Sequence, residues 1–140
     1  MSNPTMQAVM IRTATALALI LLSGCATQPA STADDALSDF VAVSELEPQD
    51  AVRFRRQPIT RPLAGHYALL QARGDHYLVQ FRRRCHELYE NTFPADIRRD
   101  RNVLRAGFDT IRGCRIDQIF SIDASQAEEL KLLAKRLEDE

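Results

Sequence analysis

The chain of 140 residues contains no Trp, and its aromatic residues amount to only 6%. This scarcity argues against a platform on which nucleic-acid bases or sugars would stack. No apolar run reaches the roughly 18–20 residues that a membrane-spanning helix requires. The net charge of −1 excludes a uniformly basic nucleic-acid-binding protein. We therefore expect no nucleic acid among the partners.

Motifs of catalysis and of cofactor binding are also missing. The five Gly form no phosphate-binding loop, no Gly-x-Ser-x-Gly pattern marks a serine nucleophile, and no HExxH pattern is present. His66, His76 and His86 recur every ten residues, and we interpret them as surface histidines rather than metal ligands. The sequence therefore predicts no enzyme, no catalytic residue, no cofactor and no metal.

The first 25 residues have the pattern of an export signal. Arg12 precedes the apolar run TATALALILL (13–22), and Ser23, Gly24 and Cys25 follow it. A charged lead, a short apolar core and small residues are typical of a cleavable secretory signal. The segment Leu-Ser-Gly-Cys resembles the lipobox of bacterial lipoproteins. That resemblance implies cleavage before Cys25 and acylation of this cysteine, and the alternative is a plain signal peptide with a chance cysteine.

The lipobox resemblance also implies a location. Two or three acyl chains hold a protein stably at a membrane, whereas one holds it weakly. Ala26, not Asp, follows the cysteine, which in this class implies an outer-membrane anchor with the domain facing the periplasm of the cell envelope. A start at Met6 or Met10 instead of Met1 leaves these expectations unchanged.

Three segments with different charge follow from the pattern. Residues 1–24 are the signal peptide, residues 25–50 are the lipidated cysteine with a flexible acidic tether, and residues 51–140 are one small domain. Residues 26–52 contain six acidic residues and no Lys or Arg, whereas residues 53–115 contain fourteen Arg and six acidic residues. A turn or two of helix over 34–41 is the most regular structure expected in the tether.

The pattern in the domain predicts short strands joined by tight turns. Residues 51–56 alternate as a strand, and 60–65, with Pro62, are expected to be a loop. Residues 66–72 and 76–82 predict a hairpin across Gly74-Asp75, in which Ala68 would face Phe81. Residues 102–111 and 115–122 predict a second hairpin across Arg112-Gly113.

Two helices complete the predicted fold. Residues 85–90 indicate a short helix. Residues 125–137 predict an amphipathic helix, with a capping box from Ser125 to Glu128 and an apolar stripe at spacings of three and four. The expected fold class is α+β, with a small, mainly antiparallel sheet of about five strands, the short helix and the C-terminal helix.

Cysteine counting predicts one disulfide. Once Cys25 is lipidated, Cys85 and Cys114 remain. An even number of remaining cysteines in an exported chain favours a disulfide between them. A metal-binding or redox pair is the alternative. Their separation is not the Cys-x-x-Cys of such sites.

The same region carries a family resemblance. Cys85, the run 107–109 (Gly-Phe-Asp), the run 114–116 (Cys-Arg-Ile), Ile119 and Asp123 resemble a family of small Gram-negative lipoproteins described only as a domain of unknown function. The resemblance covers about residues 50–124 and the lipobox. It implies location, disulfide and fold, and it implies no activity.

The clusters of arginine are the surface feature that suggests a function, because a guanidinium group binds phosphate or carboxylate in a bidentate manner. The candidate anion-binding residues are Arg53, Arg55, Arg56, Arg82, Arg83, Arg84, Arg98, Arg99, Arg101 and Arg105. Alternatives are a solvated charged surface and an acidic tether that folds over the basic middle. We expect a lipid-anchored, non-enzymatic interaction module whose partners are the membrane and an envelope protein or anionic polymer, or alternatively a binding protein for an anionic ligand.

Overall fold

The computed structural model describes residues 32–90, 97–98 and 102–139. Within these ranges, no helix is both long and apolar enough to cross a membrane. The lipobox with Cys25 lies outside the described residues, as do Arg99 and Arg101, and only the backbone of Arg98 is described.

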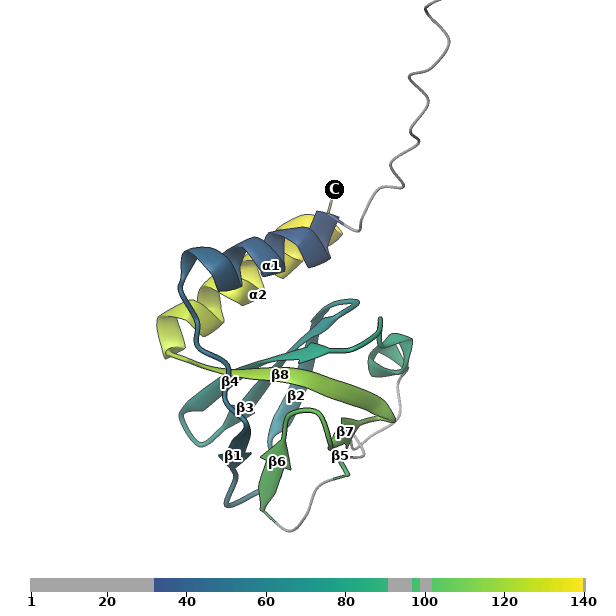
Figure 1. Cartoon of the computed structure of the whole chain (residues 1–140). Coiled ribbons are helices and arrows are strands. Elements are labelled where there is room, and N and C mark those ends of the chain that lie inside the picture. The colour runs from purple at the N-terminus through teal and green to yellow at the C-terminus, as the bar shows by residue number, and fades with distance from the viewer. Residues whose placement is uncertain (1–31, 91–96, 99–101, 140) are drawn as a thin grey trace, which may run out of the picture.

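Antiparallel strands form a curled main sheet with the order β2-β3-β4-β8-β7-β5 and a small sheet of β1 and β6 (Figure 1). The strands are β1 (Ala51–Arg53), β2 (Ile59–Ala64), β3 (Tyr67–Ala72), β4 (Asp75–Phe81), β5 (Ile97–Arg98), β6 (Val103–Arg105), β7 (Thr110–Ile111) and β8 (Cys114–Ile122). The helices are α1 (Thr32–Val43), the short 3-10 helix η1 (His86–Tyr89) and α2 (Ala124–Glu138). The predicted α+β class, with its mainly antiparallel sheet and C-terminal helix, is confirmed.

The main sheet separates two apolar cores, because successive residues of a strand point to opposite faces. On β3, Ala68 and Leu70 enter one core, whereas Tyr67 and Leu69 enter the other. The disulfide core consists of Val52, Phe54, Ala68, Leu70, Val79, Phe81, Cys85, Leu88, Leu104, Ile111, Cys114, Ile116 and Ile119. The helix core, covered by α1 and α2 (Figure 1), consists of Leu37, Leu63, Ala64, Tyr67, Leu69, Leu78, Phe120, Ile122, Ala127, Leu130 and Ala134.

A bulge in β8 lets one strand serve both cores. Ile116 and Ile119 both enter the disulfide core although they are three residues apart, a spacing that regular alternation does not allow. The register shifts between Gln118 and Ile116 opposite β4, so Asp117 is the extra residue. Beyond the bulge, Phe120 reaches the helix core.

Helix α1 corrects the predicted extent of the flexible tether. Thr32–Val43 is a twelve-residue helix, and its Leu37 is fully buried in the helix core. Ala33, Phe40 and Val41 pack against the same core. The folded part therefore includes residues that we assigned to the tether, because this apolar face gains more from burial than an unstructured acidic segment could.

Strand β2 corrects the loop predicted over 60–65. Pro62 has no backbone N–H and argued against a strand, but β2 is an edge strand with β3 as its neighbour. An edge strand tolerates Pro, because one side of its backbone needs no ladder partner. Residues 54–56, predicted to extend β1, lie beyond its end at Arg53.

The β3–β4 hairpin is present, but its predicted register was wrong by two residues. Ala68 pairs with Val79, and Ala72 pairs with Asp75, so the turn is Arg73-Gly74. Both turn residues have positive φ, 47° and 95°, as a type I′ turn requires. A register shift of two residues leaves every side chain on the same face of the sheet. Ala68 and Phe81 therefore still share a core.

The second hairpin turn is confirmed at Arg112-Gly113, where φ is 50° and 80° and Ile111 pairs with Cys114. Residues 102–111, however, are not one strand. They divide into β6, which pairs with β1, and β7, because the chain turns at Gly107 with a φ of 78°. The side chain of Asp109 fixes this turn by accepting the backbone N–H of Arg105 at 2.6 Å.

Helix α2 begins at Ala124, one residue earlier than predicted, and its N-cap lies two residues before the predicted one. Asp123 is its N-cap and accepts the backbone N–H of Gln126 at 2.8 Å, while the Gln126 side chain accepts the N–H of Asp123 at 3.0 Å. The capping box is therefore Asp123–Gln126 and not Ser125–Glu128, because Asp caps at least as well as Ser. The predicted stripe is confirmed at Ala127, Leu130 and Ala134, which are buried.

Candidate functional site

The predicted disulfide between Cys85 and Cys114 is present, with both residues fully buried and their Cα atoms 5.8 Å apart. It joins the residue before η1 to the first residue of β8. Arg112 reinforces this junction, because its guanidinium donates to the carbonyl oxygens of Glu87 and Leu88 at 3.1 and 3.2 Å, and also to that of Glu90.

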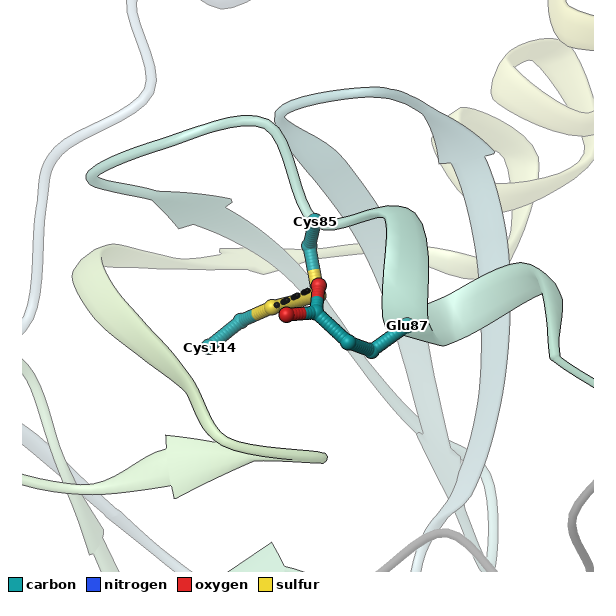
Figure 2. A group of neighbouring side chains, drawn as sticks. All are labelled: Cys85, Glu87 and Cys114. Carbon is teal, nitrogen blue, oxygen red and sulfur yellow. Dashed lines mark hydrogen bonds between the residues drawn. A yellow bond between two sulfur atoms is a disulfide. The ribbon is translucent and has the colours of Figure 1, made fainter.

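Glu87 lies beside the disulfide (Figure 2). Its Oε2 atom is 3.1 Å from the Sγ of Cys114, a sulfur–oxygen contact without a shared proton, since a disulfide sulfur carries none. Arg83 donates two hydrogen bonds to this carboxylate, at 2.5 and 3.2 Å, and thereby lowers the pKa of Glu87. Although these atoms cluster as metal ligands would, the bonded sulfurs provide no thiolate.

Arg82, Arg83 and Arg84, which we call the paired triplet, each contact a carboxylate. The Nε atom of Arg82 is 3.3 Å from Asp117, and Arg83 binds Glu87 as described. The Nη2 atom of Arg84 is 3.5 Å from Asp34. These guanidinium groups are thus already paired within the chain.

Asp34 connects the acidic N-terminal segment to the basic middle. Its Oδ1 atom accepts the backbone N–H of His66 at 2.8 Å, and its Oδ2 atom is 3.2 Å from the Nδ1 of the same residue. With Arg84 it ties α1 to the β2–β3 turn and to the segment after β4. In the part of the chain that the structure describes, Asp34 thus supplies contacts between the acidic segment and the basic middle, as the alternative of an acidic segment over the basic middle expects.

A pocket of about 580 Å³ opens at the other end of the main sheet, where the β1–β2 connection meets the β3–β4 turn. Its lining residues are Arg53, Phe54, Arg55, Arg56, Gln57, Ile59, Gln71, Ala72, Arg73, Asp75 and Asn102. We call Arg53, Arg55, Arg56 and Arg73 the pocket arginines. Among the described residues of this lining, Asp75 is the only acidic one.

The pocket arginines differ from the paired triplet in their contacts. Among the ion pairs between residues that the structure describes, none involves Arg53, Arg55, Arg56 or Arg73. Unneutralised guanidinium groups around a concave surface produce a positive potential that attracts anions. Each guanidinium also presents several N–H donors in a planar fork, which fits a phosphate or carboxylate.

Ordered residues hold the pocket wall in place. Phe54 is 2% exposed, and its ring packs edge-on against Tyr77 with centroids 5.2 Å apart. Burial and the nearby Asp75 raise the pKa of Tyr77, so its hydroxyl stays neutral. The side-chain nitrogen of Gln71 donates to Nε2 of His76 at 3.1 Å, which restrains Gln71 at the pocket.

His76 corrects the interpretation of the three histidines as surface residues. It is 8% exposed because it lies on the helix-core side of β4, between Gln71 of β3 and Ile122 of β8. His66 is half-buried and His86 is exposed, and the structure does not bring the three together.

The structure gathers only part of the predicted arginine set. Arg53, Arg55 and Arg56 line one pocket, the paired triplet lies elsewhere, and exposed Arg105 on β6 is not in the pocket lining. Arg73 was missed, because the Arg-Gly-Asp run reads as a turn and Arg73 belongs to no arginine cluster. The pairing of β2 with β3, in which Ile59 lies opposite Gln71, brings Arg73 beside the β1–β2 connection.

The chain was compared with curated proteins, solved structures and family models. No curated protein matches the chain, and no solved structure matches it. A family model described as a family of unknown function, DUF6491, matches residues 7–138. This range includes the pocket arginines, both cysteines of the disulfide and the two helices. The chain belongs to the family of unknown function DUF6491.

Proposed function

We propose that this protein is a non-enzymatic binding module of the bacterial cell envelope that holds an anionic group in the pocket of Arg53, Arg55, Arg56 and Arg73. The proposal includes no cofactor and no catalytic step. The observation that carries it is the gathering of four guanidinium groups, none paired with a carboxylate of the described chain, around one concave site.

The charge balance of the pocket supports an anionic ligand over a cationic or neutral one. Among its described lining residues are four arginines and one carboxylate, Asp75, so a bound phosphate or carboxylate would reduce repulsion among like charges. Charge-assisted hydrogen bonds to guanidinium are about twice as strong as neutral ones. The partner that this chemistry selects is an acidic envelope protein, an anionic polymer or a smaller anion.

The location is a proposal from the sequence. The run 22–25 (Leu-Ser-Gly-Cys) supports cleavage before Cys25 and acylation there, and under this proposal the chain is a lipoprotein. Anchoring in the outer membrane, with the domain in the periplasm, follows from Ala26 at the next position. Labelled palmitate should enter the parent chain in cells and should not enter Cys25→Ser. Equal labelling of both would overturn the lipid anchor.

Anion binding is tested with the full-length Cys25→Ser chain, which carries no acyl group at that position. Inorganic phosphate is titrated by calorimetry at low ionic strength into this chain and into the same chain with Arg55→Gln and Arg56→Gln. We expect affinity to fall by about tenfold or more in the variant, because two charged donors are lost. Arg136→Gln, at an exposed arginine on α2, is the matched control. Equal affinity in all three proteins would refute the anion site.

A further inference from the structure

The pocket wall has an apolar part that an inorganic anion would leave uncovered. Ile59 is 72% exposed although it lines the pocket, and Ala72 of β3 lines it too. Exposed aliphatic surface beside a charged site is unfavourable unless a ligand covers it, since each buried methylene contributes to binding. The wall therefore combines a cationic part with an aliphatic part.

The size of the pocket agrees with a ligand larger than a single ion. Small-molecule sites generally measure about 300–1,000 Å³, and this pocket measures about 580 Å³. Phe54, the aromatic residue of the lining, is 2% exposed, so its ring offers no open face for stacking a nucleotide base. The remaining apolar contacts, Ile59 and Ala72, suit a flexible hydrocarbon chain.

We infer that the ligand is an anionic amphiphile, a phosphate or carboxylate group attached to a hydrocarbon chain. This inference rests on the proposed anion site and adds to it the class of ligand. The anionic group binds the pocket arginines, and the first part of the chain covers Ile59 and Ala72. A soluble alkyl phosphate and the phosphate headgroup of a membrane lipid share this chemistry.

The test compares ligands that have the same charged group and different chains. Inorganic phosphate, butyl phosphate and octyl phosphate, each below its micelle concentration, are titrated into full-length Cys25→Ser. A second arm measures binding to phosphatidylcholine vesicles with and without phosphatidic acid. Both arms are repeated with Ile59→Ser, and with Val43→Ser as a control at the 84% exposed end of α1, outside the pocket lining.

We expect octyl phosphate to bind about tenfold or more tightly than inorganic phosphate, because burial of two methylene groups suffices for such a gain. Ile59→Ser should remove most of this gain and leave the affinity for inorganic phosphate unchanged, and Val43→Ser should change neither. Binding that requires phosphatidic acid and Ile59 in the vesicle arm would identify a membrane lipid as the source, whereas octyl phosphate binding alone would identify a soluble one.

Two results separate this inference from the proposed function. If the three phosphates bind with equal affinity and Arg55→Gln with Arg56→Gln weakens all of them, the anion site stands and the amphiphile is refuted. If a chain-length gain persists unchanged in Ile59→Ser, the chain does not contact this wall, and the inference is equally refuted. Absence of any phosphate binding would refute the proposed anion site itself.

Discussion

The paired triplet and the pocket arginines are alike in sequence and different in their surroundings. In both groups, three arginines lie close together in sequence at or just after the end of a strand of the basic middle segment, and Arg73 joins the pocket group from the β3–β4 turn. Arg82, Arg83 and Arg84 contact Asp117, Glu87 and Asp34, whereas the guanidinium groups of the pocket arginines make no ion pair with the described residues. Arginine count alone therefore does not identify a binding site, because internal pairing decides which charges remain for a ligand.

The largest effect should come from the disulfide that fixes the segment of the paired triplet. Cys85 directly follows Arg84, and its bond to Cys114 spans 29 positions. Closing a loop of that length contributes about 3.5 kcal/mol to the free energy of unfolding in the chain-entropy model. Urea unfolding of Cys85→Ala with Cys114→Ala should show a loss of this order. Unfolding the parent under reducing conditions breaks the same bond without the cavity that the Ala substitutions leave. An unchanged urea midpoint of the reduced parent would contradict the prediction.

The next effect should come from the carboxylate that Arg84 shares with His66. Asp34 is 14% exposed at its side chain and accepts the backbone N–H of His66. Asp34→Ala should lower the free energy of unfolding by about 1–3 kcal/mol, because that N–H and the Arg84 charge lose their partner. Asp35→Ala, at the next and exposed position of α1, is the control. Equal unfolding midpoints for the two variants would show that Asp34 contributes nothing.

A smaller effect on the free energy of unfolding should distinguish substitutions in the pocket arginines from substitutions in the paired triplet. Arg55→Gln with Arg56→Gln removes charges that have no ion-pair partner in the described chain, so the free energy of unfolding should stay within about 0.5 kcal/mol of the parent or rise slightly. Arg82→Gln with Arg83→Gln removes two ion pairs and should lower it. Thermal unfolding at low salt measures both. A larger loss in the first variant than in the second would reverse the comparison.

The sequence was informative where local chemistry decides the structure. The Arg112-Gly113 turn, the disulfide and the stripe of α2 follow from turn residues, cysteine parity and a period near 3.6. For helix α1 we predicted only a turn or two, because acidic and small residues dominate its composition. The spacing of Ala33, Leu37 and Phe40 carried a helical signal.

The pocket could be predicted only in part, for a physical reason. Arg53, Arg55 and Arg56 are neighbours in sequence, so their clustering was visible. Ile59 and Arg73 reach the same site through the pairing of β2 with β3, in which Ile59 pairs with Gln71. That pairing was not predicted, because Pro62 led us to expect a loop in place of β2.

The smallest effect concerns pH and the exposed pair of Arg83 and Glu87. The hydrogen bond from Arg83 lowers the pKa of Glu87 below its ordinary 4.5. A group whose pKa is lowered in the folded state adds stability above its unfolded pKa and loses it as the pH falls through the folded value. The parent should therefore be slightly more stable than Arg83→Gln near neutral pH, and the difference should shrink below about pH 4.5.

Urea unfolding of both proteins at a series of pH values measures this difference directly. Glu87→Gln is the second variant, because Gln cannot titrate at this position. The free energies of unfolding of Glu87→Gln and Arg83→Gln should differ by the same amount at neutral pH as at low pH. The pair is exposed, so the difference should also fall at high salt. A difference that persisted unchanged through the acid range would show that Arg83 acts through packing against η1 and not through its charge, and the paired triplet would then owe less to ion pairing than the distances indicate.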